Sequence, residues 1–95
     1  MRIIAGTLKG RIFAAPHTLR THPMSDKARG ALFNVLGDVE GMSVLDAFAG
    51  SGALGFEALS RGASHVTSID KDRMAVKTIK NNAVELSVES RAKVI

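Results

Sequence analysis

Residues 44–55 read VLDAFAGSGALG, and this stretch decides the fold of the 95-residue chain. A short apolar run ends at Phe48 and leads directly into the pattern G-x-G-x-x-G, with glycines at positions 50, 52 and 55. In such a pattern the first glycine permits a tight turn, the second lets a ligand approach the backbone, and the third lets a helix pack close to a strand. The stretch therefore predicts a strand, a turn and a helix whose first amides face a ligand, although the glycines could also serve the junction alone.

The residues that follow continue the alternation of strands and helices. Apolar residues at helical spacing predict helices over residues 53–61 and 74–86, and apolar runs predict strands over residues 43–48, 65–70 and 92–95. The first of these strands is apolar enough to be fully buried. The order strand, helix, strand, helix, strand predicts an α/β fold with parallel strands and right-handed crossovers.

The residues that precede the glycine pattern predict a hairpin and a leading helix. Two short strands, over residues 2–5 and 11–14, flank a glycine-containing turn. Ser25 or Asp26 is expected to cap a helix that ends at Gly37. The apolar face expected for this helix consists of Ala28, Ala31, Leu32, Val35 and Leu36.

Basic residues are concentrated at the beginning of the chain. Residues 1–30 contain six of the thirteen basic residues against a single acid, Asp26, whereas the rest of the chain is nearly neutral. The six are Arg2, Lys9, Arg11, Arg20, Lys27 and Arg29. We therefore divide the chain into a basic hairpin and connector, residues 1–24, and a ligand-binding half domain, residues 25–95. The charge favours a polyanionic partner such as RNA, although a merely solvated surface would look the same.

Two carboxylates stand near the glycine pattern. Asp70 follows Gly50 by twenty residues and ends the next predicted strand, where its side chain could accept hydrogen bonds from ribose hydroxyls. Asp70 could instead cap the next helix, as could Asp72. Asp46 precedes Gly50 by four residues, and its charge would repel a pyrophosphate but stabilise the ammonium and sulfonium groups of S-adenosylmethionine (SAM). This favours SAM over NAD, unless loop amides alone satisfy Asp46.

The composition limits the other kinds of site. The chain has no cysteine and its three histidines are scattered, so we expect no metal site. Because no apolar run is long enough for a signal peptide or a membrane span, we expect a cytoplasmic protein.

The chain resembles the RsmD-type methyltransferases, which methylate the exocyclic N2 of a guanine in 16S rRNA. The resemblance rests on residues 44–63, on the opening MRIIAGTLKG of residues 1–10, and on the Leu32, Phe33, Asn34 helix. It implies a partial Rossmann-like SAM-dependent methyltransferase fold, preceded by the hairpin and the leading helix. The chain departs from the family where His22, Met24 and Gly30 replace an expected Arg, Thr and Glu.

The resemblance also implies roles for individual residues. The expected SAM-binding residues are Asp46, Ala49, Gly50, Ser51, Gly52 and Asp70. Those expected to face 16S rRNA or the small ribosomal subunit are Arg2, Lys9, Arg11 and, from the charge pattern, Arg20. Ser25, Asp26 and Phe33 are second-rank neighbours of the cofactor, and each could equally be local structure.

No catalytic residue is assigned, because the family's Asp/Asn-Pro-Pro-Tyr/Phe motif is not found and the only prolines are Pro16 and Pro23. We expect an N-terminal portion that binds SAM but is inactive alone. The strand from Val44 to Phe48 would then have an open edge through which chains could self-associate. The alternatives are a non-catalytic RNA-binding module, a methyltransferase of another nucleic acid or of protein, and an NAD-dependent oxidoreductase.

Overall fold

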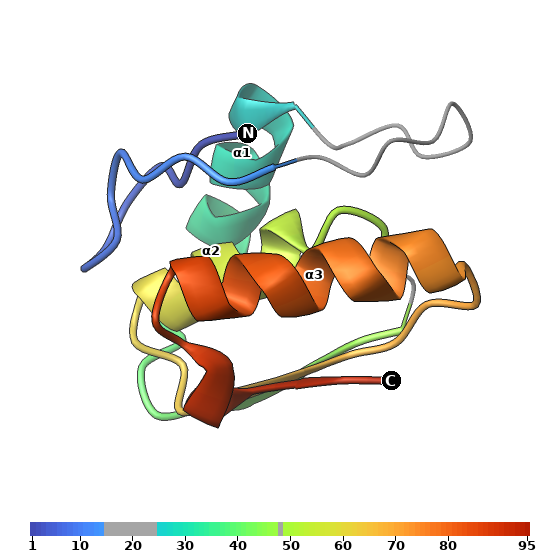
Figure 1. Cartoon of the computed structure of the whole chain (residues 1–95). Helices are drawn as coiled ribbons and strands as arrows, with labels where there is room; N and C mark the ends of the chain where they lie inside the picture. The colour runs from blue at the N-terminus through green and yellow to red at the C-terminus, as the bar shows by residue number, and fades with distance from the viewer. Residues whose placement is uncertain (15–24, 48) are drawn as a thin grey trace.

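The computed structural model describes residues 1–14, 25–47 and 49–95. Three parallel strands, β1 (Ser43–Asp46), β2 (His65–Ser68) and β3 (Ala92–Val94), form a sheet in the order β1-β2-β3. The helices are α1 (Asp26–Leu36), α2 (Ala53–Ser60) and α3 (Arg73–Glu85), and a 3-10 turn, η1 (Glu89–Arg91), precedes β3. Helices α2 and α3 lie on the same face of the sheet (Figure 1). The structure confirms the predicted α/β alternation and the parallel strands.

Strand β1 differs from its prediction in length and burial. It ends at Asp46, and Phe48 lies outside the described residues. The expected complete burial is wrong, because the side chain of Leu45 is 65% exposed. The cause is twofold: β1 is an edge strand of the sheet, and in its alternating burial pattern Val44, rather than Leu45, packs against the core.

Helix α2 packs as the glycine pattern predicts. It begins after Gly52, whose φ of 80° is left-handed, and ends before Gly62, whose φ is 103°. A Cβ at Gly55 would lie 2.9 Å from Cγ1 of Val66 on β2, which is closer than real Cβ contacts allow. Gly55 is therefore required for the close approach of the helix to the strand.

The N-terminal hairpin forms, but its two segments make an isolated antiparallel bridge and cross-strand hydrogen bonds instead of the two expected strands. An antiparallel bridge joins Arg2 to Ile12, and the Ile3 amide donates to the Arg11 carbonyl at 3.0 Å. The hairpin nevertheless belongs to the core. Ile3 and Phe13 are buried, and the Phe13 ring packs edge-on against Phe56 of α2 with centroids 5.3 Å apart.

Glu57, in the middle of α2, is fully buried and holds the hairpin in place. Its Oε1 accepts hydrogen bonds from the Ile4 amide at 2.9 Å and from Arg29 Nε at 3.3 Å. Its Oε2 accepts from the Ala5 amide at 3.1 Å and from Arg61 Nε at 2.8 Å. One carboxylate therefore joins the hairpin, α1 and the end of α2.

The C-terminal end of α2 makes a second set of contacts with the hairpin. Ser60 Oγ accepts from the Leu8 amide at 2.9 Å and donates to the Ala5 carbonyl, while the Thr7 amide donates to the Ser60 carbonyl at 2.8 Å. The turn of the hairpin lies so close to the end of α2 that position 6 must be glycine, because a Cβ there would lie 1.9 Å from the Ser60 carbonyl oxygen. These contacts fix the turn of the hairpin to the end of α2.

Helix α1 has the predicted bounds but not the predicted buried face. Ser25 Oγ accepts from the Ala28 amide at 3.1 Å, and Gly37 ends the helix with a φ of 75°. Val35, however, is 85% exposed, and the buried residues are Arg29 and Phe33. These two lie four residues apart on one face, which turns toward α2 because Glu57 binds Arg29 and the Arg61 guanidinium lies 4.7 Å from the Phe33 ring centroid.

The pKa of Glu57 indicates how the cluster depends on pH. Burial alone raises this pKa, but hydrogen bonds from the Ile4 amide, Arg61, the Ala5 amide and Arg29 outweigh burial and hold it below its ordinary value of 4.5. A carboxylate whose pKa is lowered on folding stabilises the protein fully above its unfolded pKa, and this stability is lost as the pH falls through the folded pKa.

We predict that Glu57→Gln lowers the free energy of unfolding by about 3–5 kcal/mol at neutral pH, because two arginines lose the charge they share. The difference from the unsubstituted protein should shrink as the pH falls below 4.5. Urea titrations at several pH values measure both effects. Glu89→Gln, at an exposed position, is the control and should change stability by less than about 0.5 kcal/mol. A Glu57→Gln effect independent of pH would contradict the account.

Candidate functional site

The candidate site lies at the carboxyl ends of β1 and β2, where parallel strands present their following loops at one edge. Asp46 is the last residue of β1, and its carboxylate oxygen Oδ2 is buried. The Ile69 amide donates to the Asp46 carbonyl at 2.9 Å, which holds the chain after β2 beside the end of β1. The structure therefore places Asp46 and the loop after β2 at the same edge, as the sequence predicts.

The glycine turn connects Asp46 to α2. Gly50 has a φ of 55°, and the Gly52 amide donates to the Ala49 carbonyl at 2.8 Å, which closes the turn. The structure adds a second reason for glycine at position 52, besides the predicted approach of a ligand. A Cβ there would lie 2.9 Å from Phe56 Cε2 and 3.1 Å from Ile79 Cγ1, so the packing of the chain itself requires this glycine.

Asp70 connects the glycine turn to the loop before α3. Its Oδ2 accepts from the Gly50 amide and its Oδ1 from the Asp72 amide, each at 2.8 Å. Asp72, whose Oδ1 accepts from the Met74 amide at 2.9 Å, is the cap of α3, so the alternative that Asp70 caps this helix is wrong. Asp70 instead fixes the position of the turn, a role that its spacing from Gly50 does not reveal.

Two of the expected cofactor residues, Ser51 and Ala49, are buried and hold the glycine turn together. Ser51 is buried, and its Oγ accepts from the Ala53 amide at 3.3 Å at the start of α2. Ala49 is also buried, and its amide donates to the Ile69 carbonyl at 3.0 Å. Both residues shape the turn between the two carboxylates.

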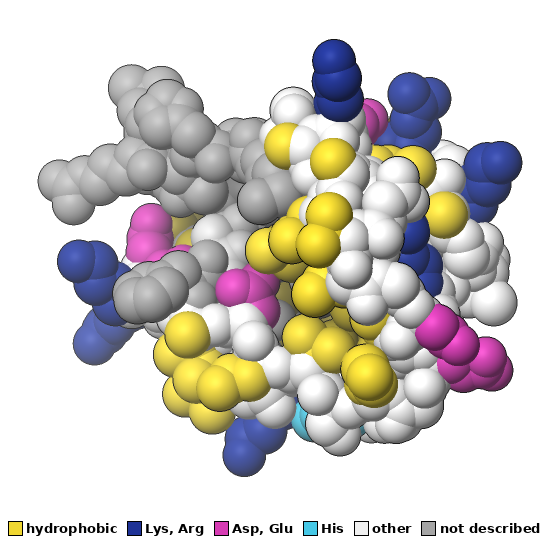
Figure 2. All heavy atoms as spheres, turned by 180° about the vertical axis from the view of Figure 1, so that it is seen from behind, with side chains coloured by type: hydrophobic (Ala, Val, Ile, Leu, Met, Phe, Trp, Pro, Cys, Tyr) yellow, Lys and Arg dark blue, Asp and Glu magenta, His cyan; other side chains and the backbone are white. Residues whose placement is uncertain are grey.

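The three second-rank residues have local roles in the structure. Ser25 caps α1, Asp26 Oδ1 lies 3.0 Å from Arg29 Nη2, and Phe33 is buried beneath Arg61. Phe33 does lie near the candidate site, because it lines a hollow of about 130 Å³ together with Asp46. The rest of its lining is apolar and comes from α1, Val39, β1 and α2. Figure 2 shows hydrophobic side chains exposed on the face of the molecule seen from behind.

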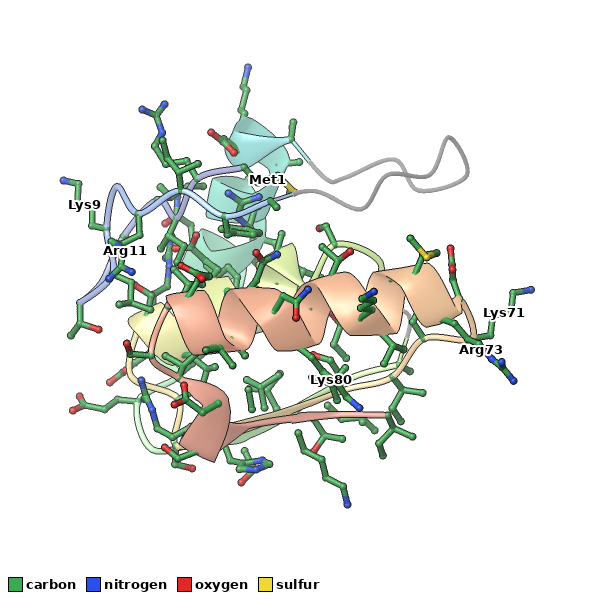
Figure 3. All side chains as sticks on the ribbon, viewed as in Figure 1. Met1, Lys9, Arg11, Lys71, Arg73 and Lys80 are labelled. Carbon is green, nitrogen blue, oxygen red and sulfur yellow. The ribbon has the colours of Figure 1, made fainter. Side chains whose placement is uncertain are left out.

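The residues expected to face RNA divide into two groups. Arg2 and Lys9 are exposed and line a hollow of about 430 Å³ between the hairpin and α1, which Lys27 also lines. Arg11 Nη2 instead donates to the carbonyl of Glu85 at the end of α3, at 2.9 Å. Lys9 and Arg11 both project from the hairpin in Figure 3. Arg20 lies outside the described residues.

The charge analysis needs one correction and one addition. Arg29 cannot contribute to a basic surface, because its side chain is completely buried against Glu57. Lys27 belongs with Arg2 and Lys9, although it was not among the residues expected to face RNA. Its position in the first turn of a helix that follows a basic hairpin was the available signal.

Two other kinds of function find no support among the described residues. Within residues 1–14, 25–47 and 49–95, no group of three or more His, Asp or Glu side chains is placed to hold a metal ion. In the same part of the chain, no helix is long and apolar enough to cross a membrane.

Comparisons with known proteins find similarity over the whole chain. The family described as "Conserved hypothetical protein 95" matches residues 1–95. Ribosomal RNA small subunit methyltransferase D of Escherichia coli K12 is 46% identical over 85 residues, which cover 87% of this chain and 43% of the relative. The protein of the same name from Haemophilus influenzae is 39% identical over 91 residues, which cover 95% and 47%.

A solved structure shows the same likeness in three dimensions. The Escherichia coli protein yhhF has a TM-score of 0.89 and 40% identity, and the match covers 100% of this chain and 51% of that chain. The chain therefore spans about half the length of the relatives that it matches.

We predict that Asp70→Ala lowers the free energy of unfolding by about 1–3 kcal/mol even without ligand, because it removes the acceptor of the Gly50 and Asp72 amides. Asp38→Ala is the matched control, since the hydrogen bond that Asp38 accepts from the Glu40 amide lies in an exposed turn. Urea titration of both variants measures the difference. Equal losses of stability would show that Asp70 does not organise the turn.

Proposed function

Because the chain belongs to the "Conserved hypothetical protein 95" family, that of the RsmD-type methyltransferases, we propose that it is the SAM-binding portion of an rRNA methyltransferase. The proposed reaction is methylation of a guanine N2 in 16S rRNA, which places the protein in the cytoplasm. SAM supplies a methyl group on a sulfonium, and the protein positions it against an unstacked base.

The observation that carries this proposal is the carboxylate of Asp46 beside the glycine turn. Asp46 ends β1 and its Oδ2 atom is buried, so its charge acts in surroundings of low dielectric. A negative charge there suits the ammonium and sulfonium groups of SAM, and it opposes a pyrophosphate. The same argument disfavours an NAD-dependent oxidoreductase.

Asp70 is proposed to bind the ribose of SAM. Each of its oxygens already accepts one backbone amide, but a carboxylate oxygen has a second lone pair with which it can accept a ribose hydroxyl. Because Asp70 is tied to both neighbouring loops, its carboxylate keeps its orientation without the ligand. These residues fit SAM. The carboxylate of Asp46 suits its cationic groups, the carboxylate of Asp70 suits its ribose hydroxyls, and a tight glycine turn lies between the two.

We also propose that this chain alone binds SAM without transferring the methyl group. In the family, the hydrogen bond from the guanine amino group is accepted by the Asp/Asn-Pro-Pro-Tyr/Phe motif, and this sequence contains no adjacent prolines. We assign no catalytic role to any residue of this chain. Asp46, Ala49, Gly50, Ser51, Gly52 and Asp70 are the proposed cofactor residues.

The edge of β1 supports a further part of the proposal. Leu45 on this strand and Leu36 on α1 are more than half exposed, and both line the 130 Å³ apolar hollow. An open apolar edge favours pairing with another strand. We therefore propose that the chain self-associates through the edge of β1.

The experiment that tests the proposal is a calorimetric titration of the purified chain with SAM and, separately, with NAD. We expect heat with SAM only, and at least a tenfold weaker affinity for Asp46→Asn, because a charge-assisted contact is worth about 1.5–3 kcal/mol. Asp38→Asn makes the same change of charge in the exposed turn before β1, so it is the control and should bind SAM normally.

The opposite results separate the rival functions. Heat with NAD, or SAM affinity unchanged by Asp46→Asn, would overturn the assignment of the site. A chain that binds neither cofactor but does bind RNA would be a non-catalytic RNA-binding module, which the exposed Arg2 and Lys9 would serve equally well.

A further inference from the structure

A basic hollow lies between the hairpin and the first turn of α1. We define it by its three exposed cationic residues: Arg2 and Lys9 from the hairpin, and Lys27 from the first turn of α1. Its volume is about 430 Å³, and Ile3, Ile4 and Gly10 supply the apolar and backbone part of its wall. Residues from two separate elements therefore bring three positive charges to one concave surface.

The one acid in the basic hollow does not neutralise these cations. Asp26 lines it, but its carboxylate pairs with the buried guanidinium of Arg29 at 3.0 Å. Among the described residues, every ion pair in the structure involves Arg29 or Arg61. Arg2, Lys9 and Lys27 are thus exposed cations that no carboxylate in the described chain engages within 4 Å, and they are available to an external anion.

The basic hollow has a fixed frame. Hydrogen bonds from the Ile4 and Ala5 amides to Glu57 hold the first strand of the hairpin, and the bonds of Ser60 to Leu8 and Thr7 hold its turn. The helix that carries Lys27 is joined to the same carboxylate through Arg29. The backbones that carry the three cations therefore do not need to rearrange on binding, which lowers its entropic cost.

We propose that the basic hollow binds backbone phosphates of an RNA strand, with Lys27 as a contact in addition to Arg2 and Lys9. This inference rests on the proposed function, since the rRNA substrate supplies the polyanion. Long side chains with charged ends suit phosphates spaced along a strand. Arg11 is not part of the basic hollow, and its Nη2 donates instead to the Glu85 carbonyl at the end of α3.

The test measures how binding of a short fluorescein-labelled RNA hairpin depends on salt, by fluorescence anisotropy over a series of KCl concentrations. Each cation that contacts a phosphate contributes about one unit to the slope of log K against log salt concentration. We expect Lys9→Gln and Lys27→Gln each to weaken binding and to reduce this slope by about one unit. Together they should reduce it by about two.

Lys80→Gln is the matched control, with the same change of charge at an exposed position on α3. Figure 3 shows Lys80 projecting from α3 on the side away from the hairpin. We expect its slope to equal that of the unsubstituted protein. A Lys27→Gln slope equal to that of Lys80→Gln would overturn the inference, as would RNA binding that none of these variants alters. The absence of any RNA binding would overturn it while leaving the separate SAM titration to decide the cofactor site.

Discussion

The structure depends on one buried carboxylate. Glu57 is completely excluded from solvent and accepts hydrogen bonds from two arginine side chains and two backbone amides. A buried charge is costly unless such partners surround it, so the cluster tolerates only one arrangement of the segments that supply them. Those segments are the hairpin, α1 and the end of α2. The carboxylate therefore specifies how the N-terminal region sits on the sheet domain.

Helix α2 connects the two surfaces to which we assign functions. Its first residue follows the glycine turn, and its last residue, Ser60, contacts the turn of the hairpin. The helix is only eight residues long. The proposed cofactor turn at its start and the hairpin that lines the basic hollow at its end are therefore held by the same short, rigid element. Asp70 adds a second tie, because it bonds the Gly50 amide on one side and the Asp72 amide on the other. Both proposed sites are thus held in position by contacts within this chain.

Much of the sheet domain could be predicted from sequence, because its signals are local. The glycine pattern constrains backbone angles directly, and the predicted role of Gly55 in helix packing is confirmed by its distance to Val66. The buried face of α1 could not be found in this way. Helical periodicity predicts that apolar residues such as Val35 are buried. In the structure Arg29 is buried instead, because it binds the carboxylate of Glu57, which is 28 residues away in the sequence. The presence of Glu57 inside an otherwise apolar helix was the signal that a buried partner is needed.

The site was predicted unevenly for the same reason. Asp46 and Asp70 were found because their spacing from the glycines places them at one edge of a parallel sheet. The bonds of Asp70 to Gly50 and Asp72 depend on loop geometry that spacing does not encode. Likewise, only the structure separates Arg11, bound to the end of α3, from Arg2 and Lys9, because a net charge does not reveal which side chains face the same hollow.

The central claim is that SAM binds at the glycine turn between the two carboxylates. The most direct test is an NMR titration of the isotopically labelled chain with SAM, which follows every backbone amide at once. The account predicts that the largest shifts occur at Gly50, Gly52 and Asp70, with little change on η1. Shifts that avoid the glycine turn, or no shifts at all at saturating SAM, would contradict it.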